Sequence, residues 1–254
     1  MISIVVVCEA NADFQLASTL ADRVLCERVE WIEADLLPHL RAYRGLSESE
    51  PFLRWDRADN EARARNIRVH GAFPDGPAEL EAKMVRRAIR LVRFVVGDDT
   101  LMVLIRDDDD QRPRRLGFEQ ARSHAKRPEL IVVGIAHTKR ECWVLAGFDP
   151  TNESEQERLE AERQTLGFDP RDHADRLTAK HDQDKLSAKR VLARLTNSDR
   201  NHETACWNEA SLNILRQRGQ VTGLDDYLSE VAERLVPLFV AESASTNSPM
   251  GSER

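Results

Sequence analysis

Apolar residues form two kinds of pattern along this chain. Unbroken apolar runs, rich in β-branched side chains and typical of buried parallel strands, occupy residues 2–8, 101–106 and 129–136. Helically spaced apolar residues, with charged residues between them, occupy residues 14–28, 79–96 and about 114–126. Strands that alternate with helices in this way predict an α/β fold, in which helices flank a parallel sheet.

The pattern changes after Pro150, where helical spacing continues without strands. We therefore expect an α/β domain at residues 1–148, with an insertion at about 29–78, and a helical C-terminal appendage at 149–242 packed on the sheet. Helices are expected within residues 152–168, 186–196, 203–219 and 224–240. Residues 243–254 are small and polar, which predicts a disordered tail.

Composition narrows the class of protein. The 254 residues carry a net charge of −7, which argues against a protein that coats nucleic acid by bulk charge. No apolar run approaches the roughly 18 residues of a membrane span, and the N-terminal run is expected to be a strand and not a signal peptide. The four cysteines have neither zinc-site nor disulfide spacing. We therefore expect a cytoplasmic protein with no membrane partner.

Acidic residues follow two of the predicted strands directly. Glu9 follows the first strand, and four aspartates, Asp107 to Asp110, follow the second. Ligands of parallel sheets bind beyond the carboxyl ends of the strands, where these carboxylates would converge. In extended backbone, Asp107 and Asp109 share one side while Asp108 points away. Crowded carboxylates favour a hard divalent cation, so Glu9, Asp107 and Asp109 are the predicted ligands of Mg²⁺ or Mn²⁺.

Other residues have two interpretations each. Glu141 is either a further ligand or a helix-start glutamate favoured by the helix dipole. Asp13 is either a group that supports the site or a helix N-cap, and Asp110 is a possible additional ligand. Each acidic residue alone is more often a solvated loop residue, and only their shared position indicates a site. Arg112, Lys185 and Lys189 are candidate phosphate contacts, although most such residues are solvated surface.

The arrangement resembles the Toprim domain of topoisomerases, primases, OLD-family nucleases and small bacterial nucleases. The sequence IVVVCEANAD is similar to the Toprim strand that ends in glutamate, and LMVLIRDDDD is similar to the strand that ends in Asp-x-Asp. The resemblance implies a Rossmann-like parallel sheet, acid–base chemistry at Glu9 and a magnesium site at Asp107 and Asp109. Residues 135–148 and the late PLF sequence are also similar to uncharacterised bacterial Toprim-like proteins.

The resemblance favours a magnesium-dependent nuclease that cleaves DNA or RNA. It also implies a setting in bacterial anti-phage defence or toxin-like action, with an ATPase encoded alongside as a possible partner, and it leaves room for an oligomer. The chain has no GxxxxGK[ST] loop, so it is not expected to be an ATPase itself. Two alternatives stay open: a non-catalytic binding module, favoured by Ala10 in place of the usual glycine, and a small-molecule phosphatase.

Overall fold

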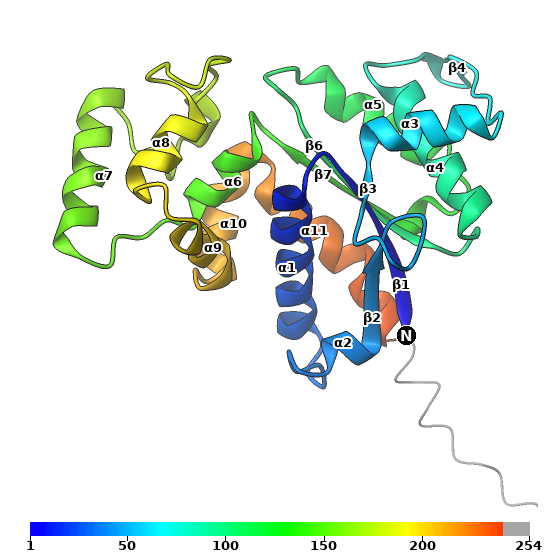
Figure 1. The fold of residues 1–254 in the computed structure, drawn as a ribbon, viewed down its shortest axis with the longest axis horizontal. Coiled ribbons are helices and arrows are strands. Elements are labelled where there is room, and N and C mark those ends of the chain that lie inside the picture. Colours follow the sequence, from blue (N-terminus) through cyan, green and yellow to red (C-terminus); the bar gives the residue numbers. More distant parts are fainter. Residues whose placement is uncertain (241–254) are drawn as a thin grey trace, which may run out of the picture.

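The computed structural model describes residues 1–240. The expected tail at 243–254 lies outside the described residues. A five-stranded parallel sheet forms the centre, in the order β2-β1-β6-β7, and a short β3 pairs with the end of β1 (Figure 1). The strands are β1 (Ile2–Cys8), β2 (Arg41–Arg44), β3 (Leu53–Arg54), β6 (Leu101–Asp107) and β7 (Ile131–Ala136). The expected α/β class is thus confirmed.

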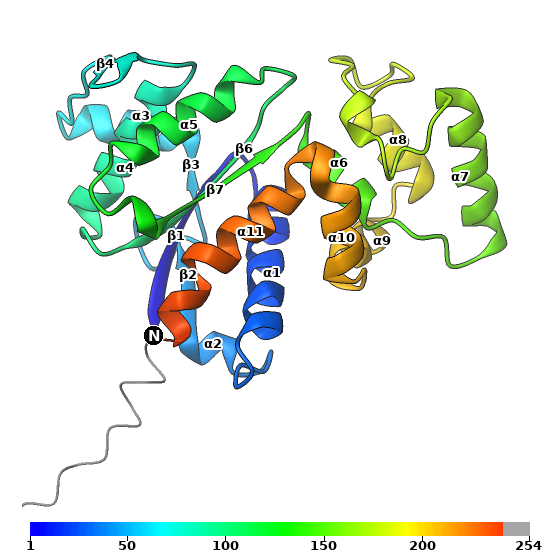
Figure 2. The same ribbon diagram turned by 180° about the vertical axis from the view of Figure 1, so that it is seen from behind.

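Helices cover both faces of the sheet, and each face has its own core. One face packs against α3 (Trp55–Ala64), α4 (Ala82–Val95) and α5 (Pro113–Ser123). The other face packs against α1 (Asn11–Arg28) and α11 (Leu224–Arg234), which lie next to each other in Figure 2. Alternate residues of each strand enter one core or the other, since side chains alternate along a strand.

Residues 29–78 contribute more than an insertion. They supply α2 (Leu37–Leu40), the edge strand β2, β3, α3 and a small antiparallel hairpin of β4 (Ala72–Phe73) and β5 (Gly76–Pro77). The strand β2 pairs with β1 along the main sheet. The segment therefore completes one edge of the sheet and one of its helical layers.

The helical C-terminal region has two parts. The first is a lobe beside the sheet, at the left of Figure 1, which contains α7 (Glu153–Leu166), α8 (Ala188–Leu195), α9 (Arg200–Asn208) and α10 (Leu212–Gly219). Short 3-10 helices lie in this region at Ala174–Arg176 and Gln220–Thr222, and another, at Pro128–Leu130, directly precedes β7. The second part is α11, which returns to cover β7. Both parts share one core with α1, so the region packs on the α/β domain.

A short buried helix, α6 (Arg140–Ala146), links the sheet to the lobe. Trp143 on α6 stacks on Tyr227 of α11 with ring centroids 5.3 Å apart, and its Nε1–H donates to the Thr222 carbonyl at 2.8 Å. Gly134 of β7 makes this packing close, because a Cβ there would lie 2.8 Å from the Tyr227 ring. None of the helices within residues 1–240 combines the length and apolarity needed to cross a membrane.

Candidate functional site

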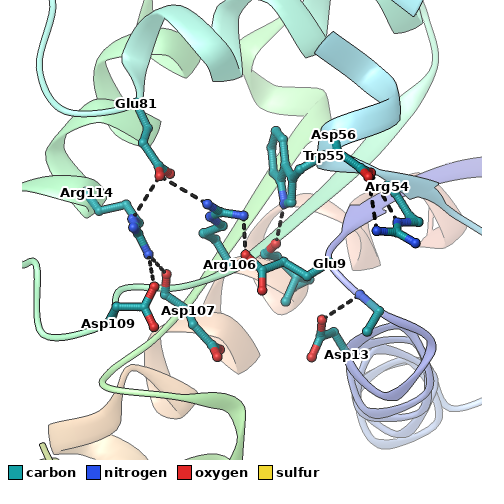
Figure 3. A network of polar contacts seen from close by, with 12 residues as sticks. Glu9, Asp13, Arg54, Trp55, Asp56, Glu81, Arg106, Asp107, Asp109 and Arg114 are labelled. Carbon is teal, nitrogen blue, oxygen red and sulfur yellow. Dashed lines mark hydrogen bonds and ion pairs between the residues drawn. The ribbon is translucent and has the colours of Figure 1, made fainter. Parts of the chain in front are cut away.

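The strands β1 and β6 are direct neighbours, and their register decides which side chains meet. Val7 pairs with Leu104, so continuing the register by two residues places Glu9 beside Arg106. Glu9 accordingly forms an ion pair with Arg106 (Figure 3). Its carboxylate is therefore paired with Arg106 and not with Asp107. Asp107 follows Arg106 and therefore points to the opposite face of the sheet.

Arg106 connects Glu9 to a second acidic side chain. Its Nη2 lies 3.2 Å from Oε1 of Glu81, and Nε of Arg114 lies 3.2 Å from the same oxygen. Nη1 of Arg114 contacts Oδ2 of Asp109 at 2.8 Å. Two guanidinium groups and three carboxylates thus form one network on the α4 and α5 side of the strand ends (Figure 3).

A second cluster lies on the α1 and α6 side, around Arg140. The backbone N–H of Arg140 donates to Oδ1 of Asp107 at 2.8 Å. Its guanidinium lies 3.1 Å from Oε1 of Glu141 and 3.7 Å from Oδ1 of Asp13. The start of α6, the start of α1 and the end of β6 therefore bring three carboxylates to one arginine.

Electrostatic repulsion is strong at this second cluster. The pKa of Asp107 is raised well above its ordinary value of 3.8, first by burial and then by the charges of Glu141, Asp13 and Glu9. The pKa of Asp13 is also raised, mainly by burial, although its hydrogen bond from Ala10 and the charge of Arg140 act in the opposite direction. Negative charge is therefore in excess here, which is a common property of functional sites.

The remaining aspartates of the run depart from the expected extended geometry. The strand ends at Asp107, and Asp109 and Asp110 have left-handed backbone with φ of 49° and 60°. The prediction that Asp109 shares a side with Asp107 is therefore wrong in this structure, since a turn replaces the strand and Asp109 contacts Arg114. Asp110 is exposed. Asp108 does point away, and its buried carboxylate contacts His137.

The turn after Glu9 suits alanine. Ala10 is the N-cap of α1 with extended backbone, φ −145° and ψ 166°, so the position needs no glycine. Asp13 lies at the third helical position, and its carboxylate accepts the Ala10 N–H at 2.9 Å. Neither Asn11 nor Asp13 is the N-cap residue itself. Asp13 both stabilises the helix start and adds charge to the cluster around Arg140.

The candidate phosphate contacts lie in two places. Arg112 is exposed at the start of α5, beside Asp108. Lys189 lies on α8, and its Nζ is 3.6 Å from an oxygen of Asp182, while Lys139 is 4.0 Å from the other oxygen. Lys185 is exposed in the loop that precedes α8. Asp182 therefore links Lys189 to Lys139, which directly precedes α6, whereas Arg112 lies at the start of α5.

Several residues of the site escaped prediction from the sequence. Arg106, Arg140 and Glu81 organise the carboxylates, and none carries a motif. Arg106 had the clearest signal, because it is a lone charged residue within an apolar strand and directly precedes Asp107. Arg140 directly precedes Glu141, but only the fold brings it to Asp107 and Asp13.

The carboxylate oxygens of the site are of the kind that binds a hard cation. Four carboxylates, those of Glu9, Asp13, Asp107 and Glu141, lie within electrostatic reach of one another, and carboxylate oxygens are the ligands that Mg²⁺ prefers. Within residues 1–240, however, no three His, Cys, Asp or Glu side chains are placed together to hold an ion. Arg106 and Arg140 hold Glu9 and Glu141, so a cation would have to replace guanidinium groups.

Comparisons with protein-family models, with curated proteins and with solved structures gave no match for this chain. The chemistry of the site is therefore inferred from its own residues.

Proposed function

We propose that the carboxyl edge of the sheet is the active site of a magnesium-dependent enzyme that hydrolyses phosphodiester bonds of nucleic acid, on a Toprim-like sheet. The observation that carries this proposal is that the end of β6 and the starts of α1 and α6 bring the carboxylates of Asp107, Asp13 and Glu141 to one arginine, Arg140. Repulsion among these carboxylates costs stability, and a divalent cation would relieve it. Arginines beside the carboxylates add groups that bind phosphate.

Each residue has a role in this proposal. Asp107, Asp13 and Glu141 would hold the cation, which when bound polarises a phosphodiester and activates water. Glu9 would exchange a proton with water or with the leaving oxygen, because it lies next to the cluster and is nearly half exposed. Arg106 would contact the substrate phosphate once it leaves Glu9.

A second candidate is the non-catalytic binding module, and one observation favours it. Glu9 and Asp109 are already neutralised by Arg106 and Arg114. Such pairs suit a site in which the acidic residues stabilise the fold or bind a basic partner. The two candidates differ in whether Mg²⁺ binds and whether cleavage follows.

The test combines cleavage and metal binding. Plasmid DNA, single-stranded DNA and RNA are incubated with the protein in Mg²⁺, Mn²⁺ or EDTA, and Mg²⁺ binding is measured by calorimetry. We expect metal-dependent cleavage that falls at least about 100-fold in Asp107→Asn and Glu9→Gln, the scale of one lost catalytic group. Asp107→Asn should also lose Mg²⁺ binding.

The matched control is Asp35→Asn, because Asp35 is exposed in the loop before α2, at the opposite edge of the sheet. Its cleavage rate should equal that of the wild type. A wild-type protein that folds but neither binds Mg²⁺ nor cleaves any of the three substrates would overturn the enzyme and leave the binding module.

A further inference from the structure

A separate cavity of about 230 Å³ lies on the other side of the end of β6 from Asp107. Polar side chains from α5, α11, a 3-10 helix and the segments that follow β6 and β7 line it: Asp108, Arg112, Arg115, His137, Gln220 and Asp226. The cavity uses none of the carboxylates of the proposed active site. It therefore has a chemistry of its own.

His137 is fixed at the wall of this cavity by two contacts. Its Nδ1 lies 2.7 Å from Oδ2 of Asp108, which is only 4% exposed. The other oxygen of Asp108 accepts the backbone N–H of Asp110 at 2.8 Å. The backbone N–H of His137 donates to the Thr222 carbonyl at 2.9 Å. These contacts orient the imidazole and commit Nδ1, so Nε2 is the ring nitrogen left for a ligand.

The charges around the cavity leave one arginine uncommitted. Asp108 is matched by His137, and Asp226 is matched by Arg115 at 2.7 Å. Arg115 also lies 3.7 Å from Glu119. The guanidinium of Arg112 has no ion pair among residues 1–240. Arg112 therefore supplies a cationic group that is free to bind an anion in the cavity that His137 also lines.

Gly223 keeps the floor of the cavity open. Its φ is +79°, and a Cβ there would lie 2.4 Å from the Ile135 carbonyl oxygen and 3.3 Å from Nη2 of Arg115. A larger residue would therefore strain the backbone and displace Arg115. The glycine allows the chain to pass close to β7 while Arg115 stays at the wall.

We propose that this cavity binds a phosphoryl group through Arg112, Arg115 and Nε2 of His137. Arginine presents several N–H donors in a plane and matches phosphate oxygens, and a positioned imidazole adds a further donor. The volume lies below the roughly 300 Å³ at which pockets for drug-sized ligands begin, which suits a phosphoryl group and the atoms next to it. The proposal does not rest on the proposed nuclease activity.

Calorimetric titration with inorganic phosphate tests this site. We expect the dissociation constant for phosphate to rise about tenfold in Arg112→Gln and in His137→Gln, the effect of one charged hydrogen bond. Arg112 is exposed, so Arg112→Gln tests the site without threatening the fold. The matched control is Arg200→Gln, since Arg200 is also an exposed arginine at a helix start without an ion pair among the described residues.

Two further arms separate the source of the phosphate and the two proposals. A short 5′-phosphorylated oligonucleotide is titrated beside inorganic phosphate: a tenfold loss for both in Arg112→Gln identifies nucleic-acid phosphate, and a loss for inorganic phosphate alone identifies a small phosphorylated compound. Asp107→Asn should keep phosphate binding even where cleavage is lost. Equal phosphate affinity in Arg112→Gln, His137→Gln and Arg200→Gln, or no binding by the wild type, would overturn the site.

Discussion

Burial of Asp107, together with the charges of Glu141 and Asp13, makes the stability of the folded state sensitive to pH. Because burial and these neighbours raise the pKa of Asp107 above 3.8, the folded protein keeps a proton that the unfolded chain has lost. Stability therefore falls as pH rises from about 3.8 through the higher folded-state pKa, and below 3.8 the two states bind this proton equally. Removing the charge of Asp107 should therefore restore the stability that is lost as pH rises.

Asp107→Asn should stabilise the protein at neutral pH. Asparagine keeps an oxygen that accepts the Arg140 N–H, and it removes the charge that Glu141 and Asp13 repel. We expect a gain of about 1 kcal/mol at pH 7, or a few degrees in Tm, that disappears towards pH 4. Thermal unfolding at pH 4 to 8 measures it, with Asp35→Asn as the exposed control. A lower Tm for Asp107→Asn at pH 7 would contradict the inferred repulsion.

At this scale the sequence indicated that Glu9 and Asp107 lie at one edge of the sheet, but not which side chains they contact. Glu9 and Asp107 were predicted from their places after apolar strands, and both lie at the shared edge. No local pattern reveals the register of β1 and β6, and this register places Glu9 beside Arg106, where the two form an ion pair. Asp109 was misplaced because the chain turns into left-handed backbone there. A run of identical residues contains no signal that marks where the strand ends.

At the scale of secondary-structure elements, Gly134 allows β7 and α11 to pack closely. A Cβ on Gly134 would lie 2.6 Å from Cδ1 of Ile105 and 2.8 Å from the Tyr227 ring. Tyr227 cannot retreat easily, because it is fully buried, stacks on Trp143 and donates its hydroxyl to the Ala17 carbonyl at 2.8 Å. The sheet, α1, α6 and α11 are thus tied together at this point.

Gly134→Ala should therefore destabilise the protein by overpacking. We expect a loss of about 1–3 kcal/mol, with a Tm several degrees lower. Gly71→Ala is the matched control, because no atom lies within 4 Å of its added Cβ. Urea unfolding of both variants provides the comparison, and equal midpoints would show that Tyr227 and Ile105 accommodate the methyl group.

Element types were more predictable than element ends. Long periodic segments gave α1, α4 and α7, and the unbroken apolar runs gave β1 and β6. No helix was predicted at 137–148, because α6 has only seven residues and its last five are all apolar, so the segment shows no helical periodicity. The edge strand β2 was hidden, since its sequence RAYR is half-buried and mostly polar.

For the whole molecule, the main consequence concerns α11. This helix is remote in sequence from the sheet, yet it covers β7 and packs beside α1 (Figure 2). Tyr227, Leu228, Val231 and Leu235 are all fully buried there. Residues 1–148 therefore hold the strands of the sheet but not all of the cover for one of its faces.

A chain truncated after residue 148 should fail to form a native core. Its exposed apolar face would favour aggregation or a loosely packed state, because large uncovered apolar patches are unfavourable in water. Near-UV circular dichroism and size exclusion measure this, with the full chain as reference. A monomeric truncated chain with a cooperative unfolding transition would show instead that residues 1–148 fold independently.

The position of α11, more than 200 residues after the start of α1, also affects how the protein folds during its synthesis on the ribosome. At ordinary rates of synthesis, roughly 10 to 40 s separate the emergence of α1 from that of α11. In the last part of that interval, once β7 has been made, the nascent chain contains the apolar strands β1, β6 and β7 but lacks the helix that covers one side of them. This side of the core is thus completed only after α11 has been made.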